Sequence, residues 1–332
     1  MALPIPNLLP SGHMTGPDDC PPLCAATLPL PPPPAAQALL DQPLAAVDDL
    51  EGARLPASWP ATIDAHVHLF PDRVFAAIWS WFDKHGWPIR YKLQTPGVIR
   101  FLLERGVERL VALHYAHKPG IARGLNTYLA QVCRQEPRVH GVATVYPGEE
   151  GAAAILEEGF AMGLRGVKLH CHVQAFAADH DSLHEIYATC VKHDAPLVMH
   201  AGREPRSAAY PVDTHTLCDA ERVERVLRGY PKLRLCVPHL GADEFDAYGV
   251  LLERHDNLWL DTTMMLADYF PLATPERIVT MRPGRVMYGS DFPNLPYAWD
   301  RELTRVTRYE RRDDALAALM GGTARGFFGL PG

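Results

Sequence analysis

Short apolar runs alternate with amphipathic segments from about residue 61 to the C-terminus, a pattern that predicts parallel strands joined by helices. Eight strands are predicted, at Thr62–Ala65, Arg109–Leu113, Val139–Val145, Gly166–Leu169, Leu197–Met199, Leu233–Val237, Leu258–Leu260 and Arg285–Tyr288. Eight strand-helix repeats favour a (β/α)8 TIM barrel. A doubly wound sheet would carry a glycine-rich phosphate turn after its first strand, and the sequence has none there.

The first 60 residues follow a different pattern, because they contain 14 of the 31 prolines and few residues that could pack in a core. We therefore expect a Pro-rich N-terminal extension, partly disordered, over residues 1–58 and a catalytic barrel over residues 59–332. Apolar residues recur between positions 44 and 55, so this part of the extension is expected to lie against the barrel.

Composition narrows the class of protein. The net charge is −7 and the basic residues are scattered, so we expect no nucleic-acid partner. No run of 18 apolar residues is present, which argues against a membrane span, and the N-terminus lacks the basic start of a secretory signal. A cytoplasmic location is the default expectation, in which the seven cysteines would be thiols.

A barrel places its catalytic residues at the carboxyl ends of its strands. His66 and His68 stand at the end of the first predicted strand, on the same face as Asp64 if the strand alternates regularly. Further polar residues end the fifth, sixth and eighth strands: His200, His239 and Asp291. Imidazoles and a carboxylate form a ligand set that suits Zn²⁺ and also Mn²⁺, Fe²⁺, Co²⁺ or Ni²⁺.

The end of the seventh strand is less specific. Asp261 there can be either a site residue or a cap of the following helix, and the sequence leaves both interpretations open.

From about residue 61 onward the chain resembles the amidohydrolase superfamily, in particular the amidohydrolase-related branch that contains aminocarboxymuconate semialdehyde decarboxylase. The motifs that carry the resemblance are Asp64–His68, Gly166–His170, Val198–Gly202, Pro238–Gly241 and Tyr288–Pro293. The resemblance implies one divalent metal ion held by His66, His68, His200 and Asp291. It also implies that His239 handles protons beside the metal.

Lys168 ends the fourth strand and admits two interpretations. In binuclear members of the superfamily a lysine at this place is carboxylated and bridges two metals, whereas the branch resembled here uses one metal. We favour the mononuclear form, in which Lys168 binds a substrate carboxylate or an acidic side chain. His170, His172 and Arg203 are candidate substrate contacts, although each could be an ordinary loop residue.

The sequence thus predicts an enzyme acting on a small molecule. The first hypothesis is hydrolysis of a small organic acid, amide or lactone by metal-activated water, with His239 and Asp291 as catalytic residues. The alternative is metal-dependent, non-oxidative decarboxylation of a small unsaturated or aromatic carboxylic acid. A non-catalytic barrel that keeps a metal for folding is less favoured, because structural zinc sites are usually rich in cysteine. The resemblance is also compatible with a homodimer.

Overall fold

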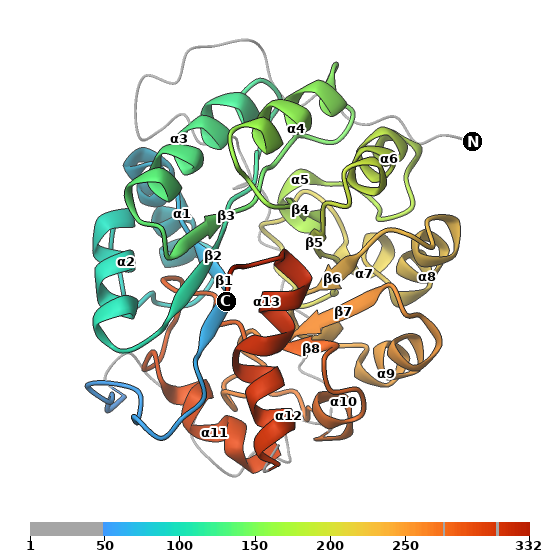
Figure 1. Cartoon of the computed structure of the whole chain (residues 1–332). Helices are drawn as coiled ribbons and strands as arrows, with labels where there is room; N and C mark the ends of the chain where they lie inside the picture. The colour runs from blue at the N-terminus through green and yellow to red at the C-terminus, as the bar shows by residue number, and fades with distance from the viewer. Residues whose placement is uncertain (1–48, 275, 310–311) are drawn as a thin grey trace.

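The computed structural model describes residues 49–274, 276–309 and 312–332, and in these residues eight parallel strands form a barrel (Figure 1). The strands are β1 (Ile63–His68), β2 (Arg109–Leu113), β3 (Val139–Gly141), β4 (Val167–His170), β5 (Leu197–His200), β6 (Leu235–Val237), β7 (Leu258–Asp261) and β8 (Val286–Met287). The predicted fold class is therefore confirmed. The third and eighth strands are shorter than expected, because regular pairing ends at Gly141 and at Met287.

Regular pairing divides the barrel into two sets of strands, β1 to β3 and β4 to β8. Two isolated parallel bridges join the sets, one between Val67 and Phe292 and one between Ala143 and Val167. The backbone N–H of His68 also donates to the carbonyl of Phe292 at 2.8 Å. These contacts close the cylinder and bring the end of β1 next to the segment that follows β8.

Helices surround the strands, as Figure 1 shows. They are α1 (Asp72–His85), α2 (Thr95–Glu104), α3 (Ala122–Gln135), α4 (Ala152–Ala161), α5 (Cys171–Gln174), α6 (His184–Lys192), α7 (Thr214–Leu217), α8 (Ala220–Gly229), α9 (Phe245–Arg254), α10 (Glu276–Thr280), α11 (Arg301–Tyr309), α12 (Asp313–Ala317) and α13 (Thr323–Phe328). Their apolar faces and the outward side chains of the strands form one large core. No helix in the described ranges is long and apolar enough to cross a membrane.

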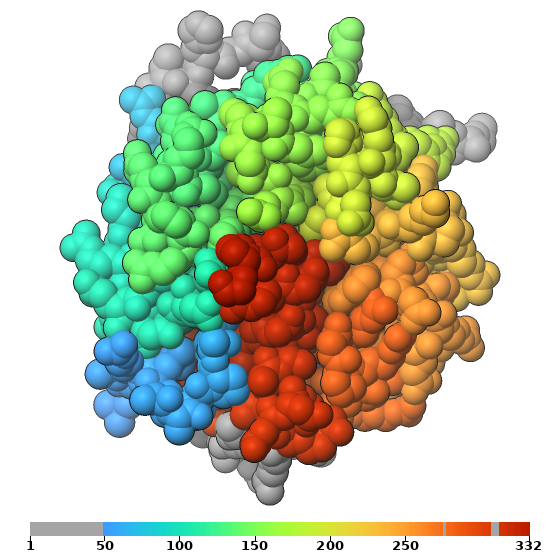
Figure 2. Space-filling model, viewed as in Figure 1, coloured from blue at the N-terminus to red at the C-terminus, as the bar shows by residue number. Residues whose placement is uncertain are grey.

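The C-terminal helix α13 covers the end of the barrel opposite the candidate site. Inward side chains of the strands, such as Ile63 and Met287, form a small second core with Ala324 and Phe327 of α13. Figures 1 and 2 show this red segment in the centre of the view, over the barrel end that faces the reader. This end of the barrel is therefore filled, and a small molecule can reach the barrel interior only from the other end.

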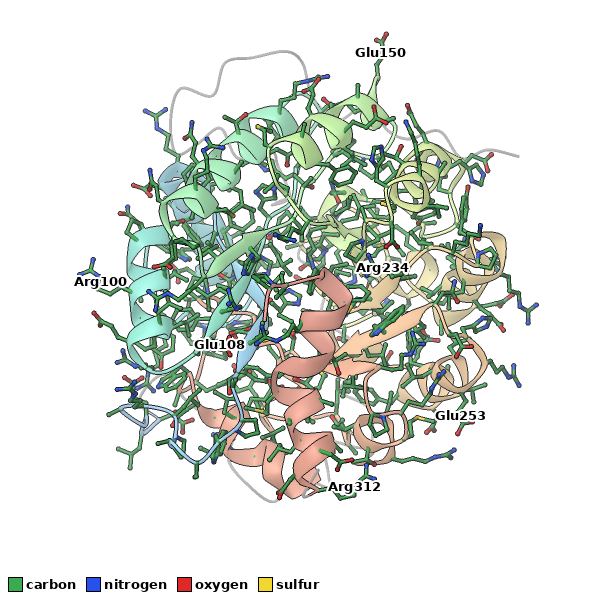
Figure 3. The ribbon with its side chains drawn as sticks, viewed as in Figure 1. Arg100, Glu108, Glu150, Arg234, Glu253 and Arg312 are labelled. Carbon is green, nitrogen blue, oxygen red and sulfur yellow. The ribbon has the colours of Figure 1, made fainter. Side chains whose placement is uncertain are left out.

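Polar contacts hold α13 in this place. Arg325 forms an ion pair with Glu108 at 3.0 Å, and Arg234 donates to the carbonyl of Phe327 at 2.6 Å. Figure 3 shows Glu108 and Arg234 on either side of the helix, whereas Arg100, Glu150 and Glu253 lie at the outer rim. These contacts hold the last residues of the chain against the end of the barrel.

The expected extension lies largely outside the described residues, which begin at residue 49. From that point the chain is attached to the barrel. Asp49 pairs with Arg301 at 3.0 Å, and the N–H of Leu55 donates to the carbonyl of Arg105 at 2.8 Å. The described part of the segment expected to pack against the barrel does so.

Candidate metal centre and cavity

Three of the four predicted metal ligands converge at the open end of the barrel. His66, His68 and Asp291 are buried, and their donor atoms all lie within 4.8 Å of one another. Asp291 Oδ1 is 3.0 Å from His68 Nε2 and 3.3 Å from His66 Nε2. Burial raises the pKa of Asp291, but the neighbouring His68 and His66 lower it more, to about 2. This carboxylate is therefore ionised at neutral pH, and two imidazoles and one anion face the same point.

Two local features of the backbone bring this group together. Asp291 has a φ of 76°, in a region that few residues other than glycine adopt, and such strain is common at functional sites. Gly289 lies against β1, where an added Cβ would come within 2.7 Å of the His66 Cβ. A larger residue at position 289 would push the His66 ring away from Asp291.

Asp64 does not join this group. The register of β1 against β2 shifts between Asp64 and Val67, so regular alternation is interrupted before His66. Asp64 instead accepts hydrogen bonds from the backbone N–H and the hydroxyl of Ser290, at 3.0 and 2.5 Å. The expectation that Asp64 shares a face with His66 and His68 is therefore wrong, because regular alternation does not hold in β1. Asp64 instead supports the loop that carries Asp291.

Asp261 proves to be a part of the centre. Its Oδ2 lies 2.8 Å from His66 Nδ1, and its Oδ1 accepts a hydrogen bond from the His239 backbone N–H at 3.1 Å. A carboxylate can only accept, so His66 Nδ1 must carry the proton and His66 Nε2 presents its lone pair to Asp291. Asp261 therefore orients a predicted ligand, and the helix-cap interpretation of this residue is not supported.

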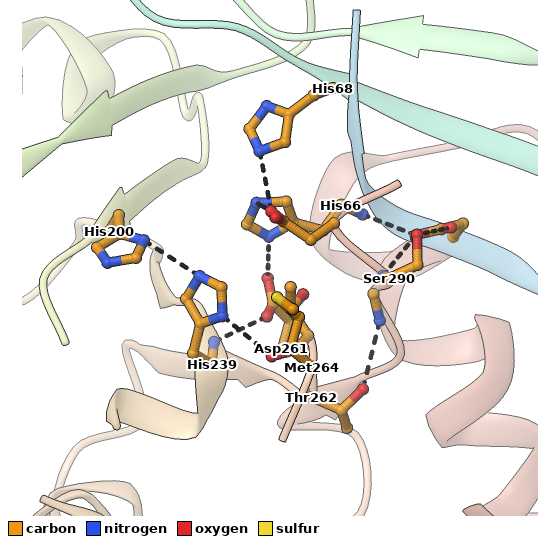
Figure 4. A network of polar contacts seen from close by, with 12 residues as sticks. His66, His68, His200, His239, Asp261, Thr262, Met264 and Ser290 are labelled. Atoms are coloured by element: carbon orange, nitrogen blue, oxygen red, sulfur yellow. Dashed lines mark hydrogen bonds and ion pairs between the residues drawn. The ribbon is translucent and has the colours of Figure 1, made fainter. Parts of the chain in front are cut away.

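His200, the fourth predicted ligand, lies outside the His66, His68 and Asp291 group. His200 Nδ1 is 3.1 Å from His239 Nε2, and His239 Nδ1 is 3.0 Å from the carbonyl oxygen of Thr263. Figure 4 shows this chain of contacts beside the His66 and Asp261 pair. Because the carbonyl only accepts, His239 carries its proton on Nδ1, and its Nε2 accepts a hydrogen bond from His200.

His170 and His172 follow Lys168 at the end of β4. The donor atoms of His170, His172 and His200 form a second group within 4.8 Å of one another. The His170 ring stacks on the His200 ring with centroids 4.1 Å apart. Burial lowers the pKa of His170 and of His200 well below the usual value, so both imidazoles are neutral.

A cavity with a mainly apolar wall opens next to both histidine groups. Its lining comprises His66, His68, Val74, Ala77, Ile78, Trp81, Phe82, Trp87, Tyr115, His117, Lys168, His170, Val173, His200, Glu204, Pro205, Tyr210, His239, Met264, Met265, Phe270, Asp291 and Asn294. The aromatic wall comes from α1 and from the loops after β1, β2, β5 and β7. The sequence gave no signal for Tyr210 or Met264, which lie in loops with no motif.

Lys168 reaches this cavity from inside the barrel. Its side chain is fully buried, and its Nζ has no hydrogen-bond partner among the described residues. Burial lowers the Lys168 pKa to about 8, although the carboxylates of Asp261 and Asp291 partly oppose this effect. At neutral pH the ammonium form still predominates, so Lys168 offers a cation to an anionic group in the cavity.

Two predicted substrate contacts do not line the cavity. Arg203 forms ion pairs with Asp243 at 2.8 Å and with Glu244 at 3.4 Å, which occupy its guanidinium. His172 is fully buried behind the cavity wall, and its Nε2 donates to the carbonyl of Gly202 at 2.8 Å. Among the predicted contacts, Lys168 and His170 are the two that line the cavity.

Comparison with known proteins assigns the family. The family model described as amidohydrolase matches residues 63–330. The chain belongs to the amidohydrolase family. A search of curated protein sequences gives no significant match.

Solved structures confirm the fold of this amidohydrolase. An uncharacterised TIM-barrel protein from Bordetella bronchiseptica aligns with a TM-score of 0.61 and 20% identity, over 81% of this chain and 98% of that one. A 5-carboxyvanillate decarboxylase from Novosphingobium aromaticivorans, solved with manganese and 4-hydroxy-3-methoxy-5-nitrobenzoic acid, aligns with a TM-score of 0.57 and 18% identity, over 86% and 99%.

A third similar structure is a probable 2-pyrone-4,6-dicarboxylic acid hydrolase from Acinetobacter baumannii. It aligns with a TM-score of 0.55 and 15% identity, over 81% of this chain and 99% of that one. A decarboxylase and a probable hydrolase thus have the same barrel fold as this chain. The family match shows that this chain is an enzyme of the amidohydrolase family.

Proposed function

We propose that the chain is a metal-dependent hydrolase of a small, planar carboxylic acid, amide or lactone. The observation that carries this proposal is the convergence of His66 Nε2, His68 Nε2 and Asp291 Oδ1 at the edge of a cavity. The same cavity holds the buried Lys168, whose Nζ has no hydrogen-bond partner in the part of the chain that the structure describes. Imidazole and carboxylate donors fit a divalent ion, with Zn²⁺ expected and Mn²⁺, Fe²⁺, Co²⁺ or Ni²⁺ also suited to the set. The orientation of His66 by Asp261 supports this fit.

When bound, a divalent ion supplies Lewis acidity, which polarises a carbonyl and acidifies water. The protein supplies position and proton transfer. Lys168 Nζ would bind a substrate carboxylate, and the aromatic wall would hold a flat ring and exclude bulk water. Asp291 would direct a water molecule toward the substrate through the carboxylate oxygen that faces the cavity.

His239 is the proposed proton acceptor. The Thr263 carbonyl fixes the proton of His239 on Nδ1, so Nε2 is the basic atom. His200 Nδ1 donates to this same atom, so His239 can take up a proton only when the contact with His200 opens. Proton transfer in this enzyme therefore requires a rotation of the His200 ring.

Decarboxylation is the second candidate, because a specific feature of the cavity favours it. The wall is largely apolar, and moving a carboxylate from water into such surroundings destabilises its charge and favours loss of CO2. The similarity to a decarboxylase solved with an aromatic acid is consistent with this chemistry.

One experiment separates the two reactions. The purified enzyme, loaded with Zn²⁺ or Mn²⁺, is screened against aromatic carboxylic acids, lactones and amides while acid release and CO2 release are both recorded. Acid release without CO2 supports hydrolysis, and CO2 release from an aromatic acid supports decarboxylation. Turnover that is unchanged after complete metal removal contradicts both.

A further inference from the structure

Asn294 is a buried polar residue of the cavity to which the proposed reaction gives no role. Its side chain is 3% exposed, and it contributes the only amide among the described residues that line the cavity. Its Oδ1 is buried and has no hydrogen-bond partner within the described part of the chain. A buried acceptor that is left unpaired is costly, so this atom needs a partner that the described residues do not supply.

Hydrogen bonds of the backbone fix the position of Asn294. Its N–H donates to the carbonyl of Asp291 at 2.9 Å, and its own carbonyl accepts a hydrogen bond from Trp87 Nε1 at 2.7 Å. The next carbonyl along the chain, that of Leu295, accepts from the N–H of Arg90 at 2.8 Å. These bonds use backbone atoms of the loop, so they hold Asn294 close to Asp291 and leave the side-chain Oδ1 for another partner.

The wall beside Asn294 is apolar. Trp87 packs against Phe82 and Phe270, with ring centroids 4.9 and 5.4 Å apart, and all three rings line the cavity. An ordered water molecule needs several polar partners, and these rings offer a water molecule at Oδ1 no second acceptor. A flat substrate that packs on the same rings would carry a substituent toward the amide.

Asn294 and Lys168 approach the cavity from opposite sides. Lys168 lies on β4 and Asn294 follows β8, and these strands are four places apart in a barrel of eight. The carboxylate at Lys168 Nζ and the group at Asn294 must therefore lie at different ends of one substrate. A hydroxyl group suits the second place, because it both donates and accepts and so pairs with either end of an amide.

We propose that Asn294 is a specificity-determining residue, which selects substrates that carry a hydroxyl group at the end remote from their carboxylate. This selection rests on the proposed function, because it needs Lys168 to hold the carboxylate in the same cavity. An apolar group at the remote end would bury Oδ1 without a partner, so the cavity should reject it.

Binding of aromatic acids that have no hydrolysable bond tests this proposal. Calorimetry with the full-length, Zn²⁺-loaded protein gives dissociation constants for 3- and 4-hydroxybenzoate and for 3- and 4-methylbenzoate, in which a methyl group of similar size replaces the hydroxyl. We expect a hydroxy acid to bind at least about tenfold more tightly than its methyl partner, which is the usual effect of one hydrogen bond.

The variants separate the amide from the rest of the cavity. Asn294→Leu removes the amide at similar volume and should abolish the preference; Asn294→Ala replaces it if the leucine variant lacks the native circular dichroism spectrum. Asn294→Asp keeps an acceptor and should retain the preference. Lys168→Met should weaken the binding of both acids and leave their ratio unchanged.

The matched control is Asn257→Ala. The Asn257 amide donates to the carbonyls of Leu227 and Tyr230, both at 3.1 Å, and does not line the cavity. This variant should show the wild-type preference.

Two results would overturn the proposal. The first is equal binding of each hydroxy acid and its methyl partner to the wild type. The second is a preference that both Asn294→Leu and Asn294→Ala leave unchanged, which would place the hydroxyl at another group. Failure of the proposed hydrolysis is a separate result, because it is measured as turnover: a preference that depends on Asn294 in a protein without hydrolytic turnover would contradict the proposed reaction alone.

Discussion

The two histidine groups at the open end of the barrel differ in charge. The group carried by β1 and the segment after β8 contains the carboxylate of Asp291, and a second carboxylate, Asp261, holds His66 in place. The group carried by β4 and β5 contains imidazoles alone. Each group has an imidazole whose lone pair is fixed by a hydrogen bond, His66 in the first and His172 in the second, but only the first group offsets the charge of a divalent ion. Orientation therefore prepares imidazole ligands in both groups, whereas the anion determines which group a divalent ion prefers.

Asp291→Asn removes the anion from the first group and should have the largest effect. We expect the affinity of the first group for Zn²⁺ to fall by more than about 100-fold, beyond the usual effect of changing an outer contact. Turnover should become undetectable. Elemental analysis and a turnover assay test this; a variant that stays fully loaded and active would show that Asp291 is not a ligand.

His239→Asn should separate metal binding from catalysis. The metal content of the first group should be retained, and turnover should fall by about 10²- to 10⁴-fold because the proton acceptor is lost. Wild-type turnover in this variant would remove His239 from the mechanism.

Asp261→Asn tests the orientation of His66. An amide can donate to His66 Nδ1 and so favour the wrong tautomer, which should lower metal affinity by about 10- to 100-fold. Calorimetric titration with Zn²⁺ measures this effect directly. Asp261 also raises the pKa of His239, so the pH profile of turnover at saturating metal should move to lower pH in the variant.

The barrel could be predicted from the sequence because the alternation of apolar runs and amphipathic helices is a local pattern. The same pattern places His66, His68 and Asp291 at neighbouring strand ends. The sequence could not show that Asp243 and Glu244 neutralise Arg203, because these residues are about 40 positions apart and meet only in the fold.

The roles of His200 and Asp261 depend on contacts that no spacing reveals. The orientation of His200 follows from a hydrogen bond to His239 on the next strand. Asp261 follows a buried strand as a helix cap often does, and only its contact with His66 distinguishes the two roles. These two contacts depend on histidine tautomers and side-chain torsions, which are determined only once the strands have assembled.

Anomalous diffraction from crystals of the full-length protein with one equivalent of Co²⁺ would locate the bound ion. We predict that the strongest peak lies between His66 Nε2, His68 Nε2 and the Asp291 carboxylate, because this group carries the anion. A strongest peak at His170, His172 and His200, or an ion bound away from both groups, would show that His66, His68 and Asp291 are not the metal centre.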